Sequence, residues 1–402
     1  MNIFYYNESF NVHDGSSGHA FGLLNSFKNH ENIEAIATFP VLDRERRDNN
    51  RAGIYTEGSG FSVAEQLLRF TKRTVLSGLR CRGLYKMLED MTKSASTVQL
   101  ARVGLFDTTP CLLSEKLRIP LVAEWNTPFY YEVGDLRNGS MMSLVKHWEL
   151  KFLQRADLIY TVSNELNQIL LDEYDLPASK LLAVPNGYDP DIYPRDKETF
   201  EKKRKAVRAK KGWIGKTVIA FIGSLKIWHG IKNLIKIAEV FSVRDEKIRF
   251  VVIGDGECRE LMRDASHRLN NLEWMVSQPP FVMAEYLIAC DLGIMPYVPI
   301  DNFYFSPLKL YDMIGAVLPS IGLSSGQINE VYRDYPEAGW GVEEGTPEEY
   351  IGLIEHLQCN KAEISAKKER LLTTRINHTW KERVDILIGS FMEIAESRKC
   401  LK

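Results

Sequence analysis

Short apolar runs alternate with longer segments of helical periodicity along almost the whole chain. Parallel strands need long crossover connections, usually helices, so this alternation predicts an α/β fold built on parallel sheets. In the first half we expect strands at residues 2–6, 33–39, 97–102, 119–124, 157–162 and 181–184. In the second half we expect strands at residues 217–223, 249–254, 292–296, 318–322 and 339–342. The 402 residues exceed one ordinary core and predict two domains of roughly 200 residues each.

Composition narrows the class of function and the compartment. The net charge of −2 argues against a nucleic-acid binder, which is normally strongly basic. The six cysteines show no Cys-x-x-Cys spacing, which indicates a reducing compartment without a zinc site. The chain starts directly with a predicted strand instead of a signal peptide, and no apolar run approaches the roughly 18 residues of a spanning helix. We expect a cytoplasmic protein, with at most peripheral contact at the inner membrane face.

The segment 303–316 (FYFSPLKLYDMIGA) carries the strongest functional pattern. Ser306 is a favoured N-cap and Pro307 suits the first helical position, so a helix is expected to start there. The N–H groups near Leu308 and Lys309, the helix dipole and the Lys309 ammonium would then converge on one point that suits a diphosphate. Asp312 follows on the same helical face, where its carboxylate could accept hydrogen bonds from a ribose. The alternative is an ordinary capped surface helix.

Five segments resemble, in order, motifs of the group 1 retaining glycosyltransferases, which transfer sugars from nucleotide donors. Residues 156–163 (ADLIYTVS) resemble the family's ADxIxxVS strand, and residues 184–189 (VPNGYD) its xPNGxD element. Residues 221–230 (FIGSLKIWHG) resemble fxGslkpWHG, and residues 252–256 (VIGDG) resemble xxGdG. The segment 303–316 resembles the SPLKLxEYMAxGxP motif. The resemblance spans roughly residues 156 to 322 and is fainter toward both ends.

This resemblance implies two Rossmann-like domains that face each other across a cleft, the GT-B architecture. Residues 1–188 would form the acceptor-binding domain and residues 189–378 the domain that binds the nucleotide sugar. Residues 379–402 would form a C-terminal helix that crosses back to the first domain. The donor would be a UDP-sugar such as UDP-glucose, and the acceptor a glycan or a lipid-linked molecule.

In the first domain, two loops that follow strands are candidates for sugar contact, because ligands of doubly wound folds bind beyond the carboxyl ends of strands. Gly15 and Gly18 lie in a small-residue loop that the family places opposite the donor. The segment 124–132 (EWNTPFYYE) offers aromatic faces for sugar rings and polar groups for hydroxyls. Within it we expect Asn126 and Glu132 to act near the reacting sugar. A plain turn and a packed aromatic loop are the structural alternatives.

In the second domain, the family grips the diphosphate with an Arg after the first strand and a Lys five residues later. This chain has Ser224 and His229 at those positions, so we expect Lys226 and Lys309 to supply the missing charge. His229 has a structural alternative, packing beside Trp228. The glycines of the xxGdG element, Gly254 and Gly256, are further candidates for nucleotide binding.

The Glu-x7-Glu motif of the family is altered here. Asp312 replaces the second Glu and keeps a carboxylate for the ribose, whereas Tyr304 occupies the place of the first Glu. Tyr304 is therefore a candidate for contact with the donor sugar, together with Asp301, Asn302 or the backbone of this loop.

The mechanism implied is a same-face substitution in which the departing diphosphate helps to deprotonate the acceptor, since no paired carboxylates are evident. We expect no cofactor and no metal, because Asp189-Pro190-Asp191 is better suited to a turn than to an Asp-x-Asp metal site. Two rival functions remain: a non-catalytic nucleotide-sugar-binding protein, and a nucleotide-sugar epimerase or phosphorylase on the same fold.

Residues 69–86 form a basic and partly apolar stretch with six Lys and Arg residues and no acidic residue. On a helix this stretch could rest on an anionic membrane and so bring the enzyme to a lipid-linked acceptor. A solvated helix face or a partner surface is the alternative.

Overall fold

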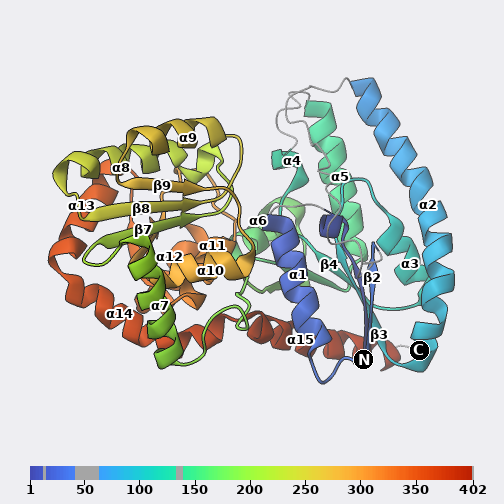
Figure 1. Ribbon diagram of the computed structural model, residues 1–402. Coiled ribbons are helices and arrows are strands. Elements are labelled where there is room, and N and C mark those ends of the chain that lie inside the picture. Colours follow the sequence, from blue (N-terminus) through green and yellow to red (C-terminus); the bar gives the residue numbers. More distant parts are fainter. Residues whose placement is uncertain (12–14, 41–62, 133–138, 401–402) are drawn as a thin grey trace. The chain divides into compact units, whose positions relative to one another are not determined.

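The computed structural model describes residues 1–11, 15–40, 63–132 and 139–400, and the chain divides into two compact units. Unit 1 comprises residues 1–185 and 383–402, and unit 2 comprises residues 186–382. Each unit holds one parallel six-stranded sheet with flanking helices (Figure 1). The predicted α/β class with two parallel sheets is confirmed.

In unit 1 the sheet order is β2-β1-β3-β4-β5-β6. Its strands are β1 (Asn2–Tyr6), β2 (Ala35–Phe39), β3 (Thr97–Arg102), β4 (Leu121–Glu124), β5 (Leu158–Thr161) and β6 (Leu181–Ala183). Its helices before the domain change are α1 (Gly15–Lys28), α2 (Val63–Ser94), α3 (Thr109–Leu117), α4 (Phe129–Glu132), α5 (Gly139–Arg155) and α6 (Asn164–Tyr174). The central strands β1, β3, β4 and β5 are almost wholly buried, as continuous apolar runs in parallel sheets require.

In unit 2 the sheet order is β12-β11-β10-β7-β8-β9. Its strands are β7 (Thr217–Ile222), β8 (Ile248–Ile253), β9 (Leu272–Met275), β10 (Leu292–Met295), β11 (Ser320–Leu323) and β12 (Gly339–Val342). Its helices are α7 (Lys197–Lys211), α8 (Ile231–Arg244), α9 (Arg259–Arg268), α10 (Pro280–Ala289), α11 (Leu308–Gly315), α12 (Gly326–Asp334), α13 (Pro347–Cys359) and α14 (Lys361–Thr374). Strand β9 was not predicted, because this edge strand contains Glu273 and buries only Leu272 fully.

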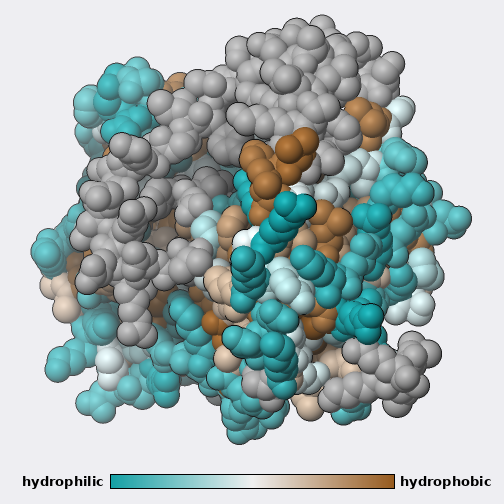
Figure 2. Space-filling model, turned by 90° about the vertical axis from the view of Figure 1, so that its right-hand side faces the viewer, coloured by the Kyte–Doolittle hydropathy of each residue, from teal (hydrophilic) through white to brown (hydrophobic). Residues whose placement is uncertain are grey.

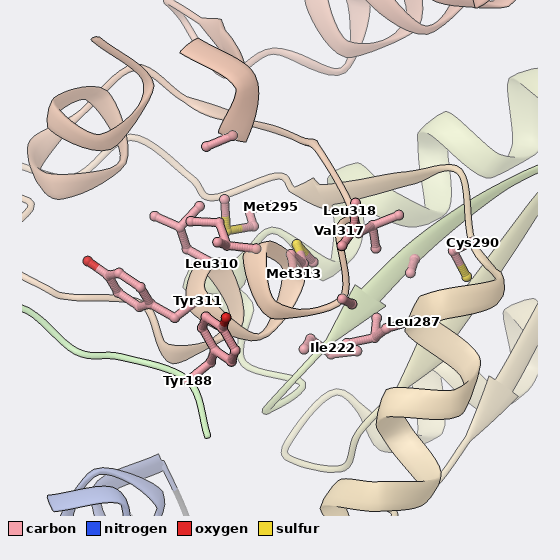
Figure 3. Close-up of a cluster of buried hydrophobic side chains, with 14 of the residues drawn as sticks. Tyr188, Ile222, Leu287, Cys290, Met295, Leu310, Tyr311, Met313, Val317 and Leu318 are labelled. Carbon is pink, nitrogen blue, oxygen red and sulfur yellow. The ribbon is translucent and has the colours of Figure 1, made fainter. Parts of the chain in front are cut away.

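The sheet of unit 2 separates two apolar cores. Along β7, Val218 and Ile222 contribute to the core that also holds α10 and α11, whereas Ile219 and Phe221 contribute to the core beside α8 and α13. This alternation follows from the two-residue repeat of a strand. Figure 3 shows Leu310 and Met313 of α11 inside the first of these cores, so that hydrophobic packing fixes the position of α11.

The C-terminal helix α15 (Trp380–Cys400) continues from unit 2 into unit 1 along the sequence. Within unit 1, Phe391 stacks on Phe27 at 6.1 Å between ring centroids, and the Arg398 guanidinium lies 2.9 Å from the Asp157 carboxylate. Across the described ranges, none of the helices is both long and apolar enough to cross a membrane.

Candidate functional site

Glycines bring two loops together at the carboxyl ends of β7 and β8. A Cβ on Gly254 would stand 1.9 Å from the carbonyl oxygen of Gly223, and a Cβ on Gly256 would stand 2.8 Å from the nitrogen of Leu225. Only glycine allows this approach of backbone to backbone. The structure thus gives Gly254 and Gly256 a packing role, and their predicted contact with a nucleotide stays a prediction.

The start of α11 differs from the prediction. The helix begins at Leu308, Pro307 precedes it with extended backbone, and Ser306 makes no capping bond. Instead, the Ser306 hydroxyl accepts a hydrogen bond from the backbone N–H of Asn186 at 3.0 Å, and the Ser306 carbonyl accepts one from the Asn186 side chain at 2.5 Å. A residue before proline favours extended backbone, and Ser306 uses it to anchor a distant segment. The backbone N–H groups at Leu308 and Lys309 still lie in the first turn.

Lys309 is a buried cation beside this helix start. Its side chain is 7% exposed, and its Nζ finds no hydrogen-bond partner among the residues that the structure describes. The Nζ lies 4.3 Å from the centre of the Phe221 ring and 4.9 Å from that of Tyr297. Burial lowers the pKa of Lys309 to about 7. A buried ammonium without a hydrogen-bond partner is costly, and the predicted contact of Lys309 with a diphosphate stays a prediction.

His229 is held in its neutral form. Its Nδ1 lies 2.5 Å from the carbonyl oxygen of Ser224, and because a carbonyl only accepts, the proton is on Nδ1 and Nε2 is left as an acceptor. Burial, followed by the charge of Lys309, lowers the pKa of His229 to about 2. The ring also packs edge-on against Trp228 at 4.1 Å between centroids. His229 therefore cannot replace the lysine with which the family binds the diphosphate. Lys226, which we expect to supply part of the missing charge, is exposed.

An aromatic cluster lies next to these cations. Trp228 stacks on Phe305 at 4.8 Å and on Tyr297 at 5.6 Å between ring centroids. Tyr304 is 7% exposed and packs on Phe305 at 4.3 Å. The structure places Tyr304 in packed aromatic surroundings, where its predicted role at the donor sugar stays untested.

Asp312 contacts the segment that follows the VPNGYD motif (residues 184–189). Its Oδ1 accepts a hydrogen bond from the Tyr193 hydroxyl at 3.2 Å. Burial and, less strongly, the charge of Asp189 outweigh the Tyr193 hydrogen bond and raise the pKa of Asp312 to about 7. Asp189 in turn accepts a hydrogen bond from the Asp191 N–H at 3.0 Å, which is the expected turn. No group of three or more potential His, Cys, Asp and Glu ligands occurs in the described parts of the chain.

In unit 1 the predicted glycine loop is helical. Gly15 and Gly18 lie in the first turn of α1, which begins at Gly15. Asn126 donates a hydrogen bond from Nδ2 to Oε1 of Glu124 at 2.8 Å. Glu132 ends α4, and its side chain lies outside the described residues.

Sequence reasoning missed two of the buried carboxylates that the structure describes in this unit. Glu124 is wholly buried at the end of β4, and Glu149 of α5 accepts hydrogen bonds from Trp125 Nε1 at 3.0 Å and the Tyr174 hydroxyl at 2.7 Å. The only available signal was that Glu124 is a charged residue at the end of an apolar strand. Such a residue must be paired if it is buried.

A cavity of about 360 Å³ lies at the other edge of the sheet in unit 1. It is lined by Arg118, Arg155 and Arg398, among others. Arg118 caps α3, and Arg155 ends α5, where the dipole of a helix favours cations. The cavity thus has a structural explanation, and it lies away from the carboxyl ends of the strands, where ligands of this fold class bind.

Family comparisons match both halves of the chain. Residues 216–360 match the family model described as "Glycosyl transferases group 1", and residues 62–192 match the one described as "Glycosyltransferase Family 4". The two matched segments together make up more than half of the chain.

Among curated proteins, the putative teichuronic acid biosynthesis glycosyltransferase TuaH of Bacillus subtilis (strain 168) is 25% identical over 195 residues. This match covers 48% of the chain and 46% of TuaH, so it spans less than half of that relative.

Similar solved structures match over nearly the whole chain. Anabaena HepE in complex with UDP-glucose has a TM-score of 0.65 at 14% identity, covering 97% of this chain and 100% of HepE. Sucrose-phosphate synthase from Thermosynechococcus elongatus has a TM-score of 0.67 at 11% identity, covering 98% of both chains. At this level of identity the similarity establishes the fold, and it confirms the predicted GT-B class.

Proposed function

Because the chain belongs to the group 1 glycosyltransferases, we propose that it transfers a hexose-type sugar, with retention of configuration, from a UDP-sugar such as UDP-glucose. The acceptor is a glycan or a lipid-linked molecule. The observation that carries this proposal is the buried ammonium of Lys309 at the start of α11, for which the described parts of the chain offer no hydrogen-bond partner.

The donor diphosphate would bind at the first turn of α11. The backbone N–H groups there and the Lys309 ammonium offer hydrogen bonds to the diphosphate. Lys226, three residues before His229, offers a second cation. His229 would contribute Nε2 as an acceptor for a hydroxyl instead of a charge. The ribose would bind Asp312, in competition with the Tyr193 hydroxyl.

Transfer would proceed on one face of the sugar, with the diphosphate as leaving group. Lys309 would stabilise the negative charge that develops on the diphosphate, which is the main catalytic need of such a reaction. We expect no metal, since the lysines and the helix start would neutralise the donor. Asn126, Glu132 and Tyr304 are the residues that we propose near the reacting sugar or the acceptor.

Two relatives support the choice of donor and pathway class. HepE has been solved with UDP-glucose, and TuaH is described as a glycosyltransferase of teichuronic acid biosynthesis. HepE supports UDP-glucose as the donor, and TuaH supports polysaccharide or glycoconjugate synthesis as the setting of this activity.

The proposal is tested with a panel of nucleotide sugars, read by thermal shift and followed by mass spectrometry of the products. We expect a UDP-hexose to raise the melting temperature and to yield UDP and a hexosylated acceptor. Binding without product would favour the non-catalytic binder, and a product in which the sugar is altered but still attached to UDP would favour an epimerase. A sugar phosphate released by inorganic phosphate would identify a phosphorylase.

Helix α2 supports a peripheral location at an anionic membrane. Val75 is 67% exposed and Leu79 is 58% exposed, while Arg82 and Lys86 are exposed one and two turns further on. Their spacing places them on one helix face. Figure 2 looks onto the side of unit 1 that carries α2 and shows hydrophobic patches between hydrophilic ones.

Arg80 does not belong to this face, which corrects the expectation from the basic stretch. Its guanidinium lies 3.0 Å from Glu8 and 3.3 Å from Asp107. The side chains of Arg69, Phe70, Lys72 and Arg73 lie outside the described residues.

Vesicle sedimentation tests this location. We expect binding to anionic vesicles at low salt and loss of binding when Arg82 and Lys86 become Glu, because each cation near an anionic surface contributes about 1 kcal/mol. The control changes the exposed Lys202 and Lys203 of α7 to Glu, which alters the net charge equally. Equal losses for both variants would indicate a general charge effect instead of a docking face.

A further inference from the structure

Glu124 is a wholly buried carboxylate with four polar neighbours. It accepts hydrogen bonds from the Tyr5 hydroxyl at 2.7 Å and from Asn126 Nδ2 at 2.8 Å. His19 Nε2 lies 3.2 Å from Oε1 of Glu124, and Arg102 lies 3.7 Å from the same oxygen. Burial alone would raise the pKa of the Glu124 carboxyl, but His19, Arg102 and the Tyr5 bond outweigh it and hold the pKa below its usual value.

These groups come from three segments that meet at the carboxyl edge of the sheet. His19 comes from the first turns of α1, Arg102 ends β3, and Glu124 ends β4 immediately before the loop that carries Asn126. The carboxyl edge is the ligand side of a doubly wound sheet. A purely structural network is the alternative, and it would be expected to satisfy all of its polar atoms.

Within the described residues, Oδ1 of Asn126 is buried and has no hydrogen-bond partner. The buried Nη1 of Arg102 has no hydrogen-bond partner there either, and its contact with this network is the 3.7 Å ion pair with Oε1 of Glu124. One is an acceptor and the other is a donor, and a sugar hydroxyl can serve both. The Asn126 amide also cannot rotate to exchange its two ends, because its Nδ2 must face the Glu124 carboxylate.

We infer that Glu124 is a positioning residue that holds the Asn126 amide with Oδ1 directed at a hydroxyl group of a sugar ligand. This inference rests on the proposed glycosyltransferase function. A neutral amide in place of the carboxylate would release this constraint, because Gln can donate as well as accept and would allow the Asn126 amide to turn.

The test compares three variants in steady-state transfer and in UDP binding. Glu124→Gln should lower kcat at least tenfold, while the dissociation constant for UDP stays within twofold, since the residues proposed to bind the nucleotide belong to unit 2. Tyr5→Phe removes another donor to Glu124 and leaves the Asn126 bond in place, so it should lower the melting temperature without lowering kcat. Asp157→Asn, at the opposite edge of the sheet where Asp157 accepts from Leu121 N–H at 2.8 Å, should behave in the same way.

A double-mutant cycle shows whether Glu124 acts through Asn126. The variant carrying both Glu124→Gln and Asn126→Ala should be no slower than Asn126→Ala alone. Hydrolysis of the donor in the absence of acceptor shows which molecule carries the hydroxyl. If Glu124→Gln slows this hydrolysis as much as it slows transfer, the hydroxyl belongs to the transferred sugar. If hydrolysis is preserved, the hydroxyl belongs to the acceptor. If Glu124→Gln does not fold, Glu124→Asp keeps the charge but withdraws it by one methylene from Asn126, with the same expectation.

The outcomes separate this inference from the function on which it rests. A folded Glu124→Gln variant with kcat within twofold of the wild type, or losses that simply add in the double variant, would overturn the positioning role alone. A wild-type protein that turns over no nucleotide sugar would overturn the proposed function, and this inference with it.

Discussion

The Lys309 side chain crosses the backbone of Gly223, and a Cβ at Gly223 would stand 3.2 Å from Cε of Lys309. Gly223 has a φ of +112°, which side-chain-bearing residues rarely adopt. Gly223, which follows β7, thus leaves room for the buried Lys309 side chain in the first turn of α11.

Gly223→Ala should therefore displace Lys309 and strain the backbone. We expect a loss of about 1–3 kcal/mol in stability and a roughly tenfold weaker affinity for UDP, measured by denaturation and calorimetry. Gly212→Ala is the control: Gly212 has a φ of +66° but no atom within 4 Å of an added Cβ. It should cost about 1 kcal/mol of stability and leave UDP binding intact. Equal effects of the two variants on UDP binding would argue against the contact with Lys309.

Lys309→Met should weaken UDP binding and, at the same time, increase the stability of the unliganded protein. Losing the charge-assisted contact should weaken UDP binding by about 1.5–3 kcal/mol and leave the affinity for uridine unchanged, since uridine has no phosphate. Removing an unpaired buried cation should raise the free energy of unfolding of the unliganded protein by about 1 kcal/mol. Calorimetry and thermal denaturation measure the two quantities. Equal losses for UDP and uridine would show that Lys309 does not contact the diphosphate.

The low pKa of Lys309, about 7, predicts how affinity depends on pH. The charged form binds the diphosphate, so affinity for UDP-glucose should be highest below pH 7 and fall by up to about tenfold per pH unit between pH 7 and 9. The stability of the unliganded protein should rise with pH instead. The pKa of Lys309 is lower in the folded protein than in the unfolded chain, so the full cost of burying this charge applies below pH 7 and decreases above it. Lys309→Met should remove both trends, and a pH profile that this variant leaves unchanged would assign them to another group.

Asp312 should make the stability of the protein depend on pH in the opposite direction to Lys309. The pKa of Asp312, about 7 in the folded protein, lies above the usual 3.8, so its contribution favours folding at low pH and is lost as the pH rises from about 4 to 7. Asp312→Asn should thus stabilise the unliganded protein by about 1 kcal/mol at pH 8 and leave it unchanged near pH 4. Because Asn keeps an acceptor, it should weaken uridine binding less than Asp312→Ala, which should cost about 1–3 kcal/mol. A collapse in melting temperature for both variants would assign Asp312 to the fold.

Local patterns predicted the sheets well, because a buried parallel strand needs a continuous apolar run that can be seen in the sequence. Strand β9 was not predicted, because this edge strand contains Glu273 and lacks a continuous apolar run. The start of α11 was misplaced because the Ser306 hydroxyl is used by Asn186, 120 residues earlier, and local capping preferences carry no information on that contact.

The candidate site was predictable to the extent that its residues lie in one motif. Lys309 and Asp312 are conspicuous beside a helix start, but the crossing of Lys309 over Gly223 depends on the order of β7 and β10 in the sheet. The neutral state of His229 depends on its burial and on the Ser224 carbonyl, and the role of Glu124 depends on neighbours from three segments. Such features arise from tertiary packing.

Turnover of UDP-glucose in the presence of excess EDTA, followed by proton NMR of the anomeric centre, tests the central claim most directly. We predict formation of UDP and a glycoside with the α configuration of the donor, at a rate that added Mg²⁺ or Mn²⁺ does not increase, because Lys309 and the start of α11 would neutralise the diphosphate. Turnover that EDTA abolishes and a divalent cation restores would contradict the assignment of this charge to Lys309, and a β-configured product would contradict same-face transfer.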